Sequence, residues 1–198
     1  MENTKAFFLQ RLLAFVIDFV IITCIASIIT MPFSNSNNVD KLTKESNELV
    51  EKYTNKEMDV MTYFNRAQDI SYDLAQETSV SSVIQIILFI LYFVVFQIYQ
   101  GGQTIGKKLL KIKVVTKDGK DLSMNAMIIR ALFNDFILSN ILVLIVTLFS
   151  RDVYFYGSLI VVMIQYLTIF ISVIMVSFSK EGRSIGDLFA NTKVISCK

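Results

Sequence analysis

The sequence contains no histidine, no tryptophan and only one proline among 198 residues. Without histidine, a Ser-His-Asp triad, a histidine base and a histidine metal ligand are all excluded. Of the two cysteines, Cys24 lies inside an apolar run and Cys197 beside the C-terminus, so we expect no disulfide and no zinc site. An enzyme is therefore the least favoured class, no cofactor or metal is expected, and any proton chemistry must fall to carboxylates.

Charged residues are also scarce, at 18% of the chain against 54% hydrophobic residues and a mean hydropathy of +0.55. An ordinary soluble domain is less apolar than this, so we expect a protein of the lipid bilayer. A helix needs about 20 mostly apolar residues to cross the hydrocarbon core. Four segments qualify, at about residues 12–31, 80–99, 126–149 and 154–178. The expected fold is an all-α membrane protein, a four-helix transmembrane bundle forming a single domain over residues 1–198.

Polar residues interrupt two of the four segments. Asp18 lies within the first, which is too long for the core of a signal peptide and is predicted to be a retained helix. The third segment is the weakest of the four, because it contains Arg130, Asn134, Asp135 and Asn140.

Lysine and arginine set the expected orientation, because loops rich in them stay in the cytoplasm. Residues 101–124 carry six lysines against two aspartates, whereas residues 40–77 carry five basic and nine acidic residues. We therefore predict a multi-pass protein of the cell membrane, with both termini and residues 180–198 in the cytoplasm and residues 32–79 outside. The basic run at 107–113 is expected to contact anionic lipid headgroups, and nucleic acid is not expected as a partner.

The outer segment, at about residues 39–78, has a helical pattern of its own. No glycine or proline occurs between Pro32 and Gly101, and apolar residues recur at steps of three, four or seven from Leu42 to Leu74. We expect an amphipathic helix or a helical hairpin, laid on itself or on the membrane surface. The alternative is a helix that binds a partner protein.

A short motif occurs twice, at residues 102–115 and 182–195, each time directly after an apolar segment. The copies share an isoleucine, a lysine, a valine and two glycines, and the glycines are Gly102, Gly106, Gly182 and Gly186. We expect turns and close packing at these glycines, because neither copy has the sequence of a phosphate-binding loop. Upstream of each copy, an arginine near a helix start is followed by an aspartate, Arg11 by Asp18 in the first half and Arg130 by Asp135 in the second. The simplest interpretation is a tandem duplication of two helices and a cytoplasmic amphipathic motif, with the outer segment inserted in the first copy.

These patterns, taken in order, resemble the RDD family, which is named for one arginine and two aspartates. Arg11 and Asp18 fit its opening pattern, residues 102–115 its central block, and residues 182–187, ending in Asp187, its closing block. The resemblance covers most of the chain except the outer segment. It implies a membrane protein, with some members linked to exchange of monovalent cations for protons and others to regulation of membrane partners.

The depth of Asp18 calls for a partner, since a lone ionised carboxylate two turns into a span is costly. We predict a direct or one-water contact between Asp18 and an arginine, Arg11 or Arg130, with Asp187 closing the same charge cluster. This cluster, completed by Asp135, is the candidate site. The sequence leaves two roles open for Asp18, a structural pair that pins helices together or a protonatable site for a cation.

Two functions follow from these features. The first is monovalent cation/proton exchange, carried out by a monomer or a homodimer. The second is a non-catalytic accessory, regulatory or immunity protein that binds a membrane partner through residues 39–78.

Overall fold

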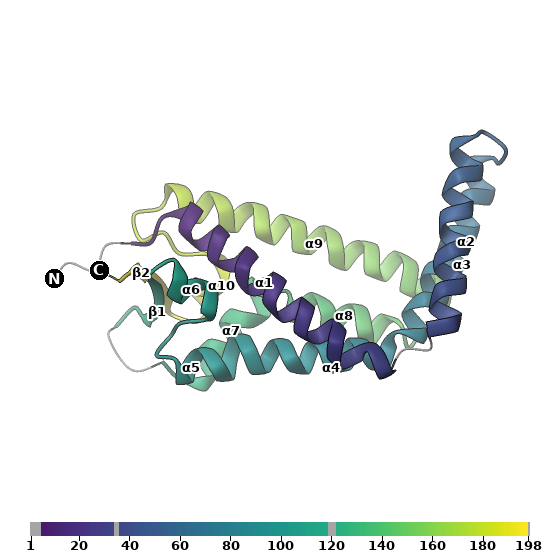
Figure 1. Cartoon of the computed structure of the whole chain (residues 1–198). Helices are drawn as coiled ribbons and strands as arrows, with labels where there is room; N and C mark the ends of the chain where they lie inside the picture. Colours follow the sequence, from purple (N-terminus) through teal and green to yellow (C-terminus); the bar gives the residue numbers. More distant parts are fainter. Residues whose placement is uncertain (1–4, 34–35, 119–121, 198) are drawn as a thin grey trace.

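The computed structural model describes residues 5–33, 36–118 and 122–197, and most of them are helical. Its long helices run side by side in one bundle (Figure 1), and they are α1 (Phe8–Thr30), α4 (Ser79–Ile90), α7 (Met124–Asn134) with α8 (Ile137–Val146), and α9 (Arg151–Phe178). A short turn, η1 (Met31–Phe33), follows α1. Helix α4 continues through a π-helical stretch, η2 (Leu91–Phe96), into α5 (Gln97–Tyr99).

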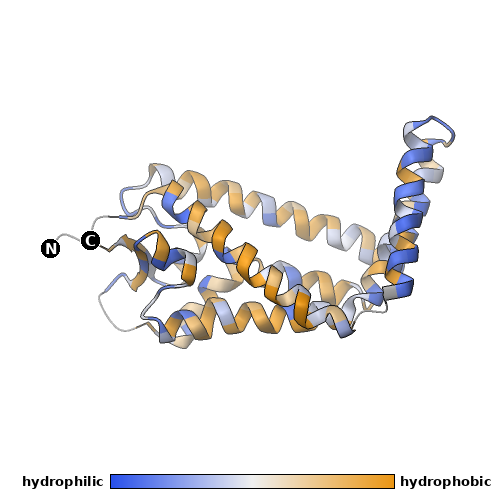
Figure 2. Ribbon diagram, viewed as in Figure 1, coloured by the Kyte–Doolittle hydropathy of each residue, from blue (hydrophilic) through white to orange (hydrophobic). Residues whose placement is uncertain are grey.

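Three of these helices are long and apolar enough to cross a membrane, at Phe8–Phe33, Ser79–Tyr99 and Arg151–Phe178, and α7 with α8 would make a fourth if the pair is one bent span. Apolar residues dominate the bundle, as Figure 2 shows in orange, whereas the outer segment is largely hydrophilic. Large apolar side chains such as Ile28, Met163 and Phe170 are exposed on the bundle surface. An apolar exterior of this kind suits lipid contact, as expected for a membrane protein.

The expected third span, residues 126–149, is not one straight helix. Helices α7 and α8 meet at an angle of 68°. Between them, Phe136 has a left-handed backbone with φ of 61°, which an L-residue other than glycine seldom adopts. Two of the polar residues that interrupt this span, Asn134 and Asp135, lie at the break, where Asn134 accepts a hydrogen bond from Ser184.

The outer segment forms a helical hairpin of α2 (Ser36–Thr54) and α3 (Val60–Glu77), which pack on each other and project across the direction of the bundle (Figure 1). Asp59 caps α3 by accepting hydrogen bonds from the backbone of Met61 and Thr62. The base of α3 is tied to the start of α9, where Arg151 pairs with Asp69 at 2.8 Å. The end of the bundle that carries this hairpin is called the hairpin end below.

At the opposite end, which we call the terminal end, two short helices and two strands pack beneath the bundle. They are α6 (Ile105–Leu109), β1 (Ile112–Thr116), α10 (Ile185–Phe189) and β2 (Thr192–Ser196). The strands pair antiparallel with Val114 opposite Val194, and both valines are buried. The sequence predicted amphipathic motifs here but not this sheet.

The two glycine motifs have the same local structure, residue for residue, at an offset of 80. Thr104 and Ser184 cap α6 and α10 in the same way, each accepting a hydrogen bond from the backbone three residues on. Lys111 and Asn191, which follow these helices, both have a left-handed backbone, with φ of 52° and 50°. Because the strand register is also symmetric about Val114 and Val194, the motifs are related by an approximate twofold axis.

Gly106 is required where α6 crosses α1. A Cβ placed at Gly106 would lie 2.2 Å from the carbonyl oxygen of Ala14, a distance that forces the backbones apart. At Gly157, by contrast, the nearest atom is a methyl carbon of Val146 at 3.1 Å, which is free to adjust.

Substitution of Gly106 by alanine is therefore expected to destabilise the protein by about 1–3 kcal/mol, the usual cost of overpacking. Thermal unfolding in detergent would measure this as a lower Tm, with Gly157→Ala as the control that changes Tm much less. Equal Tm values for the two variants would contradict the close packing of α6 on α1.

Candidate functional site: a charged cavity at the terminal end

Asp18 joins α1 to two other elements through uncharged donors. The Tyr92 hydroxyl donates to Asp18 at 2.5 Å, the Thr104 hydroxyl at 2.5 Å and the backbone N–H of Gly106 at 2.7 Å. The side chain is fully buried. These donors compensate the carboxylate without a cation, because a charged acceptor with three donors is well solvated by the protein.

Of the predicted direct or one-water contact between Asp18 and an arginine, the direct form is therefore wrong, and the contact through one water stays a prediction. Within the part of the chain that the structure describes, neither Arg11 nor Arg130 makes a hydrogen bond or an ion pair with Asp18. The arginines instead take Asp187 as their shared partner, and the hydroxyl and amide donors of η2 and α6 take their place at Asp18.

A similar arrangement, made by weaker groups, occurs at the second glycine motif. The Ser184 hydroxyl donates to Asn134 at 3.1 Å, as Thr104 does to Asp18, and the side chain of Asn134 contacts Gly186 as Asp18 contacts Gly106. The structural counterpart of Asp18 is thus Asn134 and not Asp135. The sequence comparison placed the match one residue too far along the chain.

Tyr92 and Ser172 complete the correspondence between the halves. The backbone N–H of Ile105 donates to the Tyr92 hydroxyl at 3.2 Å, and that of Ile185 donates to the Ser172 hydroxyl at 3.3 Å. The π-helical turn of η2 carries Tyr92, and such turns are frequent at functional sites.

Asp187 holds together the predicted charge cluster. One of its oxygens accepts from Arg130 at 2.9 Å and the other from Arg11 at 3.2 Å. Burial on its own would raise the pKa of Asp187, but the two guanidinium groups and the backbone N–H of Ser184 hold it below its usual value. Arg11 also donates to the carbonyl oxygen of Val194, so the cluster joins α1, α7, α10 and β2.

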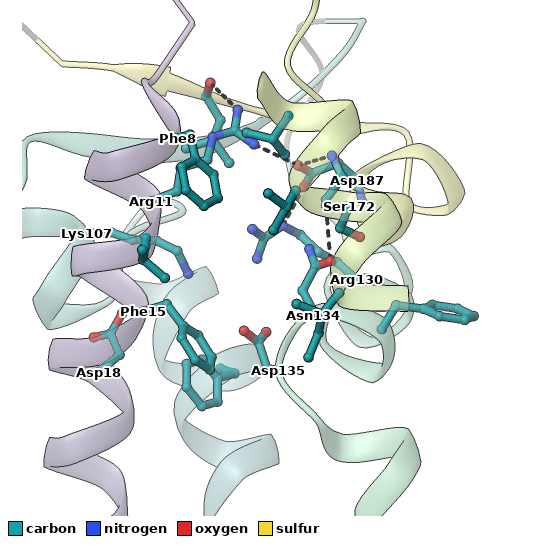
Figure 3. Close-up of a pocket in the computed structure, with 18 of the residues that line it drawn as sticks. Phe8, Arg11, Phe15, Asp18, Lys107, Arg130, Asn134, Asp135, Ser172 and Asp187 are labelled. Atoms are coloured by element: carbon teal, nitrogen blue, oxygen red, sulfur yellow. Dashed lines mark hydrogen bonds and ion pairs between the residues drawn. The ribbon is translucent and has the colours of Figure 1, made fainter. Parts of the chain in front are cut away.

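A cavity of about 230 Å³ opens beside this cluster, and it is lined by charged side chains, by aromatic residues of α1, η2 and the α7–α8 break, and by apolar residues of α9. We call it the inner cavity. In Figure 3, Lys107, Arg130 and Asp135 surround a common space, and Asp18 stands apart from them beside α1. All five predicted charged residues line this cavity, and Lys107 joins them.

Not every polar atom in the inner cavity is compensated. Asp135 is 4% exposed and Arg130 is 6% exposed. Nonetheless, Asp135 Oδ2 and Arg130 Nη1 have no hydrogen-bond partner among the described residues. Buried polar atoms are almost always satisfied, so these two mark a place for water or a bound ion.

The family follows from this arrangement together with one comparison. The family model described as the RDD family matches residues 5–191. The chain belongs to the RDD family. No curated protein and no solved structure gives a significant match to it. The residues that carry the family resemblance, Arg11, Asp18 and Asp187, all lie around the inner cavity.

Lys107 faces the inner cavity of this RDD-family chain from α6. Its ammonium group donates to Gln97 Oε1 at 3.2 Å and is 8% exposed. The pKa of Lys107 is lowered to about 8, mainly by burial and also by the positive charge of Arg130, while the negative charge of Asp135 opposes the shift. Lys107 and Asp187 occupy equivalent positions in the two motifs, so the halves present opposite charges to one cavity.

The sequence identified five charged residues of this site but missed most of their partners. A seven-residue spacing of polar residues along the second span did include Tyr92, yet nothing in it distinguished a carboxylate ligand from an ordinary contact between helices. Thr104 could have been found as the residue that caps α6, because a threonine before a helix commonly accepts a hydrogen bond there.

The Asp187 cluster makes a prediction about stability. Asp187→Asn leaves two buried guanidinium groups without a counterion, so it is expected to cost about 3–5 kcal/mol. Unfolding of purified protein in detergent would measure the loss, with Asp40→Asn, at an exposed position on α2, as the control that leaves Tm unchanged.

The same cluster also predicts a pH dependence with a definite sign. Because the pKa of Asp187 is lowered in the folded state, its stabilisation is present above the unfolded value of about 4 and is lost as the pH falls below it. The Asp187→Asn variant should lack this part of the acid dependence. A variant that unfolds like the wild type across this pH range would exclude Asp187 as the charge that holds the cluster together.

Proposed function

We propose that this RDD-family protein exchanges a monovalent cation for a proton, and that the exchange takes place in the inner cavity at Asp135 and Lys107. The observation that carries the proposal is the buried carboxylate of Asp135, whose Oδ2 has no hydrogen-bond partner among the described residues and which lines the same cavity as Lys107. The bilayer orientation that fits is the one expected from charge, with four spans, α7 and α8 forming one of them, and the terminal end in the cytoplasm.

Asp135 is better placed for this role than Asp18. The Asp18 carboxylate already has three donors, so a cation would have to displace well-made hydrogen bonds. Asp135 lies at the break between α7 and α8, facing the cavity. Membrane transporters commonly bind their ions where a span is broken, because backbone groups and side chains freed at the break are available as ligands.

The charges around the inner cavity allow exchange without a change in the total charge of the cavity. Arg11 and Arg130 are matched partly by Asp187, and the remaining positive charge and Lys107 are matched by Asp18 and Asp135. When a cation enters and binds the carboxylate of Asp135, the ammonium group of Lys107 releases one proton to water in the cavity. One positive charge then replaces another, which avoids the large cost of an unbalanced charge in a membrane.

The two glycine motifs have nearly the same local structure, which supports the duplication inferred from the sequence. A duplication also explains how two unlike charged residues come to face one cavity. Both motifs direct their third helical residue at the cavity, so a change of one residue in one copy gives a lysine facing an aspartate. Two halves of like orientation enclose the cavity between them.

The experiment is proton movement in proteoliposomes that hold a pH-sensitive dye and receive a pulse of Na⁺, K⁺ or Li⁺. Asp135→Asn and Lys107→Arg are each expected to lower the initial rate at least tenfold, because the first removes the cation ligand and the second replaces the proton carrier by a group that stays charged. Their Tm values should be measured alongside, with Asp40→Asn as the matched acidic control.

The rate of exchange should also depend on pH. With a pKa of about 8, Lys107 is mostly protonated below pH 7 and mostly neutral above pH 9, so the rate should peak near pH 8. A folded Asp135→Asn variant that exchanges at the wild-type rate would remove Asp135 from the mechanism, and a wild-type protein that moves no protons with any of the three cations would refute exchange.

The second candidate, an accessory protein that binds a membrane partner, draws its support from the hairpin. Apolar side chains Val50, Val60 and Met61 are exposed towards its tip. Glu45 and Arg66 form an ion pair at 3.0 Å across the hairpin, so residues 46–65 can be replaced by a short glycine-rich linker between them. If this shortened protein loses the cellular function of the wild type but still exchanges cations in vesicles, the accessory role is favoured over exchange.

A further inference from the structure

A second cavity, of about 390 Å³, lies at the hairpin end of the bundle between α3, α4, α8 and the start of α9. Hydroxyl and amide groups form its polar lining, at Ser71, Thr78, Ser82, Gln85, Asn140, Thr147 and Tyr154. Among these residues, Tyr154 alone is ionisable, so the chamber offers neutral oxygens where the inner cavity offers charges. We call it the outer cavity.

Two amide side chains indicate that the outer cavity holds water. Within the described ranges, Gln85 and Asn140 make no side-chain hydrogen bond, although both lie in apolar segments of the bundle; Gln85 is half-buried and Asn140 is exposed where the cavity opens. An amide left unpaired in hydrocarbon costs several kcal/mol. The cavity far exceeds the roughly 10–15 Å³ that one water requires, so water can satisfy both amides.

Apolar side chains lie between the outer cavity and the inner one. On α4 and η2, Phe89 stands one turn from Ile86 of the outer cavity and one turn from Phe93 of the inner cavity, and it is 1% exposed. On α8, Ile137 lies between Phe136 of the inner cavity and Asn140 of the outer cavity and is 2% exposed.

Ring contacts close the layer across the helices. Phe19 of α1, which is 38% exposed at the edge of the layer, packs edge-on against Phe89, with ring centres 6.2 Å apart, and against Phe136, with ring centres 6.3 Å apart. Phe15 packs against Phe136 at 5.5 Å. The aromatic layer, which we define as Phe15, Phe19, Phe89, Phe136 and Ile137, therefore joins three of the spans.

We propose that the outer cavity is a second cation-binding chamber, in which neutral hydroxyl and amide oxygens hold a monovalent cation, and that the aromatic layer is the barrier which that cation crosses to reach the inner cavity. The proposal rests on cation/proton exchange as the function. Hard, singly charged cations take oxygen ligands, and a chamber without carboxylates binds them weakly enough to let them leave.

The first experiment measures whether water and cations enter the outer cavity. In a protein with Cys24→Ser and Cys197→Ser, Asn140→Cys is expected to react with a charged, membrane-impermeant thiol reagent added from the hairpin side. Ile145→Cys is the matched control, because Ile145 lies on the same helix but its side chain is exposed on the bundle surface and does not line the cavity. Reaction at position 140 should be at least tenfold faster.

Cation binding is then read as protection of that thiol. Na⁺, K⁺ or Li⁺, whichever drives proton movement in vesicles, should slow the labelling of Asn140→Cys at least threefold at constant ionic strength set with choline. Ser82→Cys, on the opposite wall, provides a second reporter that does not remove the amide at position 140. Absence of labelling at both positions, or labelling that the cation does not change, overturns the outer chamber.

The second experiment tests the barrier. Phe19→Ala removes one ring from the aromatic layer, and it is expected to raise passive proton or cation leak in vesicles at least threefold while lowering coupled exchange. Phe170→Ala is the control, because Phe170 is an exposed phenylalanine of α9 outside the layer. Unchanged leak in a folded Phe19→Ala protein overturns the barrier.

Failure of this inference differs from failure of the exchange function. Wild-type exchange that depends on Asp135, together with an unreactive outer cavity, would leave the function in place and remove the chamber. A wild-type protein without exchange would remove both, whatever the labelling.

Discussion

The bundle closes through one carboxylate, that of Asp187, which is shared by two arginines from different spans. Arg11 comes from the start of α1 and Arg130 from α7, and each would be a buried or half-buried charge without it. Because Arg11 also reaches Val194 in β2, the same cluster fixes the small sheet against the helices. The position of the inner cavity follows, since its walls are the elements that this cluster joins.

The two glycine motifs share their local backbone structure but not their charges. Asp18 and Asn134 occupy equivalent places, and so do Lys107 and Asp187. In the first half the buried acid lies on the long helix and is held by hydroxyl groups, while in the second half it lies on the short helix and is held by arginines. The cavity is thus asymmetric in charge although the two motifs beside it are alike, and among the described residues neither Asp135 nor Lys107 has a direct ion-pair partner.

Much of this arrangement could be predicted from sequence, and the failures have physical causes. Three of the four expected spans were readable because length and hydropathy alone decide them, and Arg11, Arg130 and Asp187 were grouped correctly because buried charges require partners. The partner of Asp18 was wrong because hydroxyl and backbone donors carry no charge pattern along the chain. The break at Phe136 and the turn at Lys111 could not be predicted because residues other than glycine adopt a left-handed backbone there. The strands β1 and β2 could not be predicted because each is only five residues long.

The contact between Arg11 and Asp187 spans 176 residues of sequence. During synthesis at about 5–20 residues per second, α1 is therefore complete for roughly ten to thirty seconds before the residue that neutralises its arginine exists. Throughout that interval the charged start of α1 must remain in water or among headgroups, and β1 has no strand to pair with. The charge cluster can form only after Asp187 has left the ribosome, so α1 and α7 are both made before the carboxylate that joins them.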